Sequence, residues 1–94
     1  MENQHRKIKG YRELSQEEID LMNRIKVHGE KTEALINELV ELRRDQEQDV
    51  CQGIDRGVSY PQVTTSIRNC RIAKEHLQTG QMWLVRAVAL PDSF

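Results

Sequence analysis

Apolar residues recur at helical spacing along most of this 94-residue sequence. Ile19, Met22 and Ile25 lie three residues apart, and leucines, isoleucines and valines resume the pattern further along the chain. Spacings of three and four residues place such side chains on one stripe of a helix, where they can pack against another element. The stretch KVHGEKTE, residues 26–33, interrupts this stripe, and Gly29 within it predicts a kink.

The first helix has a clear start signal at Ser15. Ser15 followed by Glu18 forms a capping box, in which the side chain of each residue accepts a hydrogen bond from the backbone N–H of the other. Acidic side chains in the next turn suit the positive end of the helix dipole. The pattern predicts a first helical region at residues 15–47.

A polar stretch that contains two glycines and Pro61 separates the two apolar patterns. Glycine and proline favour turns, so we expect a connecting loop at residues 48–61. A last helix is predicted at residues 62–90, ending before Pro91, which cannot continue a helix. Its apolar stripe comprises Val63, Ile67, Cys70, Ala73, Leu77, Leu84 and Val88.

These elements predict an all-α fold within a single domain at residues 1–94. A short N-terminal arm at residues 1–14 and a kinked helix are followed by an antiparallel helical hairpin. The composition, 37% hydrophobic and 31% charged, fits a folded chain rather than a disordered one. A chain this short buries a limited fraction of its surface, so association with further copies would add burial.

The segment MWLVRAVAL, residues 82–90, is apolar almost all the way round. A helix with this composition is buried on more than one side, and a two-helix hairpin offers only one partner helix. A local core around Trp83 is the alternative interpretation. We expect instead that the segment packs against other copies of the chain, which predicts a homo-oligomer.

Charge is unevenly distributed along the chain. Residues 1–12 have four basic side chains against one acidic, a net of +3; residues 13–60 have six against twelve, a net of −6; residues 61–94 have four against two, a net of +2. A protein that binds double-stranded nucleic acid usually has a larger positive excess on one face, because each phosphate contact adds affinity. Two small basic clusters suit a small anionic ligand better.

No arrangement typical of catalysis or of a resident metal is visible in the sequence. His5, His28 and His76 do not occur at metal-binding spacings, and no glycine-rich phosphate loop follows a strand. We therefore expect neither enzymatic activity nor a cofactor. Cys51 and Cys70 are expected to be thiols, since a reducing compartment disfavours disulfides.

No apolar run approaches the roughly 18 residues of a membrane span. The charged N-terminus also differs from a signal peptide, so the interior of the cell is the expected location and no membrane partner is predicted.

The arm HRKIKGYRE, residues 5–13, combines cationic side chains with one tyrosine. Lys9 and its neighbours can donate hydrogen bonds to phosphates, and Tyr11 offers a flat face on which a nucleobase can stack. This combination indicates a nucleotide ligand. The alternative is a frayed basic tail with Tyr11 packed against the helix.

HRKIKGYRELSQEEIDLMNRIK at one end and LQTGQMWLVRAVALPDSF at the other resemble the bacteriophage anti-CBASS cyclic-oligonucleotide sponges, relatives of the anti-Thoeris hairpin sponges. The resemblance covers these two ends, and the central residues 27–66 match poorly. It implies a helical hairpin that assembles into a compact hexamer in the infected host cytoplasm. It also implies that cyclic dinucleotide and trinucleotide messengers, which activate CBASS effectors, are bound whole and not degraded.

The resemblance also implies site residues. Tyr11 corresponds to the arm tyrosine that stacks on the bases, and Lys26 to the helix lysine that meets the phosphates. Arg68 resembles an arginine of a second pocket for cyclic trinucleotides, and Arg71 adds charge nearby. Asn69 departs from this pattern, because the family commonly has an aromatic residue after that arginine, so dinucleotide binding is better supported than trinucleotide binding.

Geometry gives a separate reason to expect a shared site. Lys26 is eleven residues after Ser15, about 16 Å along a helix, and Tyr11 lies on the other side of that cap. A two-fold axis can bring Tyr11 of one chain to Lys26 of another and do so twice, which matches the symmetry of a cyclic dinucleotide.

A competing interpretation is a helical oligomeric module whose basic arm contacts DNA, RNA or a protein. The mild net charge and the lack of a helix-turn-helix signature disfavour it. A cyclic-nucleotide phosphodiesterase ranks third, because the sequence has no metal ligands at suitable spacing.

Overall fold

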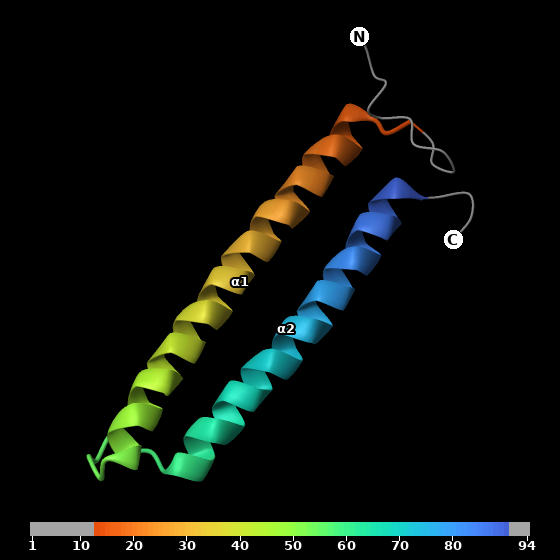
Figure 1. Ribbon diagram of the computed structural model, residues 1–94. Coiled ribbons are helices and arrows are strands. Elements are labelled where there is room, and N and C mark those ends of the chain that lie inside the picture. The colour runs from red at the N-terminus through yellow and green to blue at the C-terminus, as the bar shows by residue number, and fades with distance from the viewer. Residues whose placement is uncertain (1–12, 91–94) are drawn as a thin grey trace.

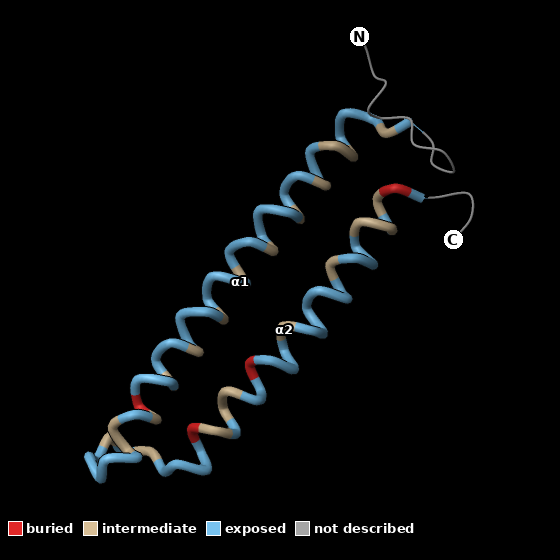
Figure 2. The backbone as a smooth tube through the Cα atoms, in the orientation of Figure 1, coloured by how far each residue is buried: buried red, intermediate tan, exposed pale blue. Residues whose placement is uncertain are grey.

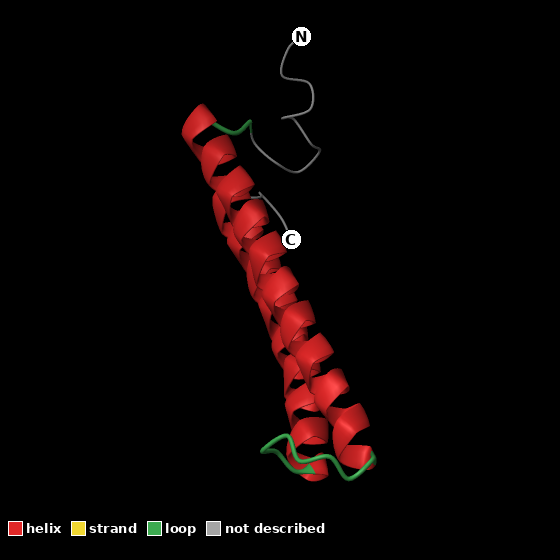
Figure 3. Cartoon of the chain, turned by 90° about the vertical axis from the view of Figure 1, so that its left-hand side faces the viewer, coloured by secondary structure: helices red, strands yellow, loops and turns green. Residues whose placement is uncertain are grey.

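Two long antiparallel helices form the described part of the chain in the computed structural model, which describes residues 13–90 (Figure 1). Helix α1 is Gln16–Cys51, helix α2 is Tyr60–Ala89, and the loop at residues 52–59 joins them. The helices lie side by side in one layer, and the long axis of the molecule measures 62 Å (Figure 3). The predicted all-α hairpin is confirmed.

The predicted capping box is present at the start of α1. The backbone N–H of Glu18 donates to Ser15 Oγ at 3.2 Å, and the backbone N–H of Ser15 donates to Glu18 Oε1 at 2.8 Å. These bonds satisfy N–H groups that have no partner inside the helix. The box therefore places the start of α1 where the sequence predicted it.

The predicted kink at Gly29 is wrong. Residues 26–33 are helical, and α1 has no sharp bend (Figure 1). One glycine inside a helix costs only about 1 kcal/mol relative to alanine, which the surrounding turns tolerate. Gly29 lies instead where α2 comes close: a Cβ placed there would be 2.6 Å from Gln81 Cδ. The glycine gives room to the Gln81 side chain and leaves the helix path unchanged.

The predicted loop at residues 48–61 is too long. Helix α1 continues past residue 47 to Cys51, and α2 begins at Tyr60 rather than at residue 62. A second capping box, which the sequence analysis missed, starts α2: Gln62 N–H donates to Ser59 Oγ, and Ser59 N–H donates to Gln62 Oε1 at 2.8 Å. The sequence contains the signal for this helix start, because Ser59 is followed three residues later by Gln62, and Pro61 occupies the first turn, where proline is favoured.

Arg56 ties the loop to the end of α1. Its guanidinium donates to Asp49 at 2.6 Å and to Asp45 at 3.1 Å, and these two bonds raise the pKa of Arg56. Gly53 and Gly57 take the positive φ values of 82° and 74° that the tight connection requires. The charged residues before the loop therefore belong to the helix and brace the turn.

Three contacts fix how the helices align. Arg43 Nε donates to Ser66 Oγ at 2.9 Å, Lys74 Nζ lies 3.7 Å from Glu33 Oε2, and Gly29 faces Gln81. Arg43 also donates to Gln46, the buried polar residue in this part of the chain, at 2.8 Å. The exposed Lys74–Glu33 pair contributes little energy, so Arg43 and its two partners specify the register better.

The hairpin by itself has a small core. Among residues 13–90, the buried apolar side chains are those of Val63, Cys70 and Ala89 (Figure 2). Only part of the predicted stripe of the last helix packs on α1, because Leu77 and Leu84 remain 50% and 55% exposed. The hairpin thus leaves apolar surface that one chain does not cover.

Candidate functional site

Lys26 lies on α1 near the open end of the hairpin, where α1 begins and α2 ends. Its side chain is exposed and makes no hydrogen bond or ion pair with another residue in 13–90. Successive residues of a helix are rotated by about 100° around its axis, and this rotation places Lys26 on a flank of α1, beside the surface that contacts α2. Its ammonium group is therefore available to an anionic ligand.

Arg68 and Arg71 lie on α2 toward the loop end and are also exposed. Within the described chain neither forms an ion pair or a side-chain hydrogen bond. Residue 29 lies beside residue 81, so in this antiparallel pair Lys26 lies near the level of residue 84. At about 1.5 Å per residue, Arg68 and Arg71 are then roughly 20 Å from Lys26 along the hairpin. One chain does not bring these cations together, which suits two separate binding sites.

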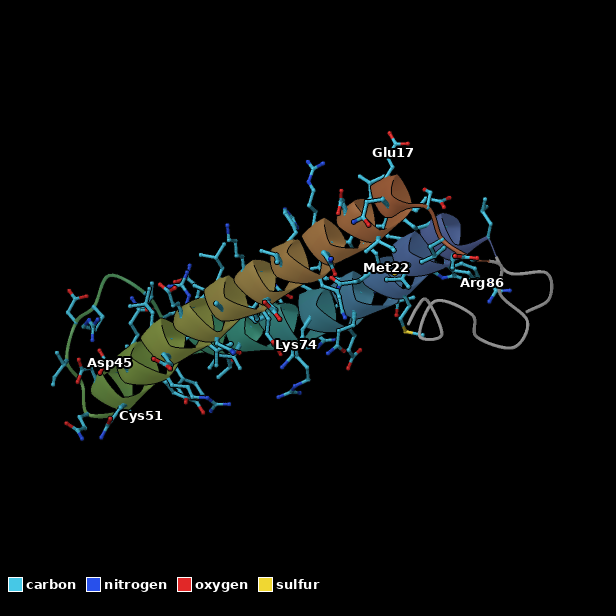
Figure 4. All side chains as sticks on the ribbon, turned by 90° about the horizontal axis from the view of Figure 1, so that it is seen from above. Glu17, Met22, Asp45, Cys51, Lys74 and Arg86 are labelled. Atoms are coloured by element: carbon cyan, nitrogen blue, oxygen red, sulfur yellow. The ribbon has the colours of Figure 1, made fainter. Side chains whose placement is uncertain are left out.

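Tyr11 and Lys9, the predicted residues of the arm, lie outside the described residues, as does most of the arm itself. Three of the five predicted site residues, Lys26, Arg68 and Arg71, can therefore be placed. These three residues lie between the two ends of the hairpin that Figure 4 labels. Asp45 and Cys51 mark the loop end, and Met22 and Arg86 lie toward the open end.

A shallow, open hollow on α1 lies close to Lys26 in sequence. Asn23, Arg24, Val27, His28 and Lys31 line it, and its volume is about 340 Å³. All five residues belong to one helix, and they face a different side of α1 from Lys26. A drug-sized ligand is usually buried over most of its surface, so this open hollow alone does not form such a site.

Met82 is a neighbour of Lys26 that the sequence analysis did not assign to the site. Gln81 faces Gly29, so Met82 lies near the level of residue 28, and helical periodicity places it on the same broad side as Lys26. Its side chain is 71% exposed, the largest value among the exposed large apolar side chains of the described residues. A cation and an apolar side chain therefore lie near each other at the open end.

Residues 13–90 contain neither a metal-binding cluster nor a membrane-spanning helix. No group of three or more histidine, cysteine or acidic side chains is arranged to hold a metal ion. No helix in this range has the length and apolar character needed to cross a membrane. Cys51 is exposed and Cys70 is buried, and both are free thiols.

Comparison with known protein families identifies the hairpin. The family described as "Acb2/Tad1, hairpin domain" matches residues 3–89. The chain belongs to this family. The match includes the central residues 27–66, where the sequence alone showed little resemblance. Membership in the Acb2/Tad1 hairpin family therefore rests on the whole hairpin and not only on its ends.

A relative supports the same assignment. The chain is 39% identical over 107 aligned positions to "Anti-CBASS protein 2" of Pseudomonas phage JBD67, with 98% of each chain covered. The two proteins thus correspond from end to end. This similarity confirms the resemblance to the anti-CBASS family that the terminal sequences indicated.

Proposed function

We propose that this protein sequesters cyclic dinucleotide messengers of bacterial CBASS defence without cleaving them, inside the infected host cell. The observation that carries the proposal is the end-to-end similarity to a phage protein named for its action against CBASS. The uncommitted cations Lys26, Arg68 and Arg71 support it, because they offer donors for phosphates. The acidic balance of residues 13–60 disfavours binding to long nucleic acids.

In the proposed dinucleotide site, Tyr11 stacks on a base and Lys26 pairs with a phosphate, with Lys9 adding positive charge. The site is shared between chains of a homohexamer, because Lys26 is eleven residues, about 16 Å, along α1 from Ser15, and Tyr11 precedes that cap in the sequence. A two-fold axis supplies each contact twice. Burial of both bases between protomers would allow Kd values near the nanomolar range, which corresponds to about −12 kcal/mol.

Sequestration is tested by recovering the ligand. Excess protein is incubated for hours with a cyclic dinucleotide, heat-denatured and the released material chromatographed. We expect full recovery of intact cyclic nucleotide that reactivates its effector, because the sequence carries no catalytic motif and residues 13–90 hold no cluster that could bind a metal ion to cleave a phosphodiester. Linear dinucleotide that accumulates with time would contradict the proposal, and the ligand incubated without protein is the control.

Arg68 and Arg71 form the second proposed site, for cyclic trinucleotides. Arg68→Ala is expected to lower trinucleotide affinity about tenfold or more, the value of one charge-assisted hydrogen bond, and to leave dinucleotide affinity unchanged. Calorimetry with both ligands measures the difference. Arg44→Ala, which removes another exposed cation from the hairpin, is the matched control. Equal losses for both ligands with Arg68→Ala would indicate a single pocket.

A further inference from the structure

Gln46 is a buried side chain with hydrogen-bond donors that the hairpin does not use. It is 9% exposed, and its Oε1 accepts from Nη1 of Arg43 at 2.8 Å. A guanidinium can only donate, so this bond fixes the orientation of the amide and leaves Nε2 as its donor group. Among residues 13–90, no atom accepts a hydrogen bond from Gln46 Nε2. Buried donors are nearly always paired, so an acceptor beside Gln46 is expected.

Arg43 brings a positive charge to the same place without a carboxylate to balance it. Its Nε donates to Ser66 Oγ at 2.9 Å and its Nη1 donates to Gln46, so the donors of Nη2 are unused within the described chain. In that part of the chain Arg43 forms no ion pair, although Glu47 follows it by about one helical turn. Charges that are partly removed from water are normally paired, because their desolvation is costly. An anion would supply the missing charge.

Ser66 completes a cluster that we call the donor cradle: Arg43 and Gln46 on α1, with Ser66 on α2. The Ser66 hydroxyl accepts from Arg43, and its own hydrogen has no acceptor within residues 13–90. The hydroxyl of Thr64, on the same helix, donates to the backbone carbonyl of Pro61 at 3.1 Å. All three side chains of the cradle therefore have donors without partners, while their acceptor atoms already receive hydrogen bonds from Arg43.

The surroundings of the donor cradle favour an anion. Val63 and Cys70, three residues before and four residues after Ser66, are 1% and 6% exposed. Hydrogen bonds to a charged group are stronger in such apolar surroundings than in water. The cradle also lies beside the first two turns of α2, where the helix dipole is positive and the first turn contains no acidic residue.

A phosphate group matches these donors best. Its tetrahedral oxygens can accept from donors on two helices, and arginine binds phosphate with parallel N–H groups. A carboxylate offers its acceptors in one plane. A water molecule would satisfy the amide of Gln46 but would leave the charge of Arg43 unbalanced.

The donor cradle is separate from the cations proposed above to bind nucleotides. Arg43 is seventeen residues from Lys26 along α1, which corresponds to about 25 Å. Arg68 is two residues from Ser66, and the rotation of about 200° between them directs Arg68 to another side of α2. The cradle would therefore hold a group of its own.

We propose that the donor cradle is a phosphate-binding site, in which Arg43, Gln46 and Ser66 hold one phosphate group. The group belongs either to inorganic phosphate or to a nucleotide, since both present the same oxygen acceptors. The site does not depend on the dinucleotide site at Lys26. A bound phosphate would connect α1 to α2 and thereby stabilise the folded hairpin.

Inorganic phosphate added to the full-length protein tests this proposal, with chloride at equal ionic strength as the reference. The unfolding temperature should rise saturably, by about 4 °C or more once phosphate exceeds its Kd severalfold. The side-chain amide signals of Gln46 in nitrogen–proton NMR spectra should shift along the same titration, because Nε2 would donate to the phosphate.

Two variants and a matched control sharpen the test. Gln46→Glu should abolish the phosphate-dependent rise and keep wild-type helicity by circular dichroism, because its carboxylate would pair with Arg43 and repel phosphate. Ser66→Ala removes one donor without adding a charge and should weaken phosphate binding severalfold. Gln48→Glu adds the same charge at an exposed position of α1 and should keep the wild-type response.

The proposal would be overturned by a rise no larger in phosphate than in chloride, by an equal rise in Gln46→Glu, or by unmoved Gln46 signals at saturating phosphate. Calorimetry with cyclic dinucleotides and trinucleotides then identifies the source of the phosphate. Affinity lowered by Gln46→Glu but not by Gln48→Glu would assign the cradle to a nucleotide phosphate, and unchanged affinity would assign it to inorganic phosphate. Dinucleotide binding by the wild type decides the proposed function separately.

Discussion

Tyr11→Ala is expected to weaken cyclic dinucleotide binding at least thirtyfold. Stacking of an aromatic side chain is worth about 1–3 kcal/mol per base, and a two-fold site loses two stacks, so the expected loss is about 2–6 kcal/mol. Lys26→Ala should have an effect of similar size, because it removes two charge-assisted contacts with phosphates. Isothermal calorimetry with a panel of cyclic dinucleotides measures both variants.

Conservative substitutions serve as controls for this first prediction. Tyr11→Phe keeps the flat ring and should retain most of the affinity, and Lys31→Ala removes another exposed cation of α1 without touching the proposed site. Helicity and molar mass should stay at wild-type values in all four variants. Wild-type affinity in Tyr11→Ala and Lys26→Ala would remove both residues from the site.

Trp83→Glu is expected to lower the molar mass of the assembly and, with it, ligand affinity. Trp83 is 66% exposed, and helical periodicity directs it away from α1, so the hairpin itself gains little from the indole. A tryptophan buried between copies commonly contributes about 2 kcal/mol or more, and a carboxylate in its place adds a desolvation cost. Because the ligand site is proposed to lie between chains, smaller oligomers should bind cyclic dinucleotides more weakly.

Light scattering and calorimetry on the same samples test this second prediction. Gln78→Glu introduces the same negative charge five residues earlier on α2 and should change neither mass nor affinity. Trp83→Glu should retain wild-type helicity by circular dichroism, since the intrachain contacts are preserved. An unchanged mass would contradict the placement of Trp83 between copies of the chain.

The elements of the hairpin were largely predictable because their signals are local. The box formed by Ser15 and Glu18 and the helical spacing of apolar residues depend only on neighbours along the chain. The predictions were wrong where one local signal is compatible with two structures. Gly29 can either break a helix or accommodate a close neighbour, and only the position of Gln81 on α2 decides between them.

The loop boundaries show the same limit. The polar residues 43–49 are compatible with either a linker or an exposed helical face, and the bonds from Arg56 to Asp45 and Asp49 form only once the chain has turned back. Site prediction was limited in another way. The sequence indicated which cations to examine, but their separation along the hairpin depends on the register that Arg43 and Ser66 specify.

The sequence by itself determined the helix content, the start of α1, the hairpin arrangement and the family to which the terminal segments point. These properties depend on capping, on periodicity and on residue identities, all of which are read along the chain. The tertiary structure decided which apolar residues one chain covers and which it leaves exposed. Val63 and Leu77 belong to the same predicted stripe, yet Val63 is 1% exposed and Leu77 50%, because a single partner helix contacts only one side of α2.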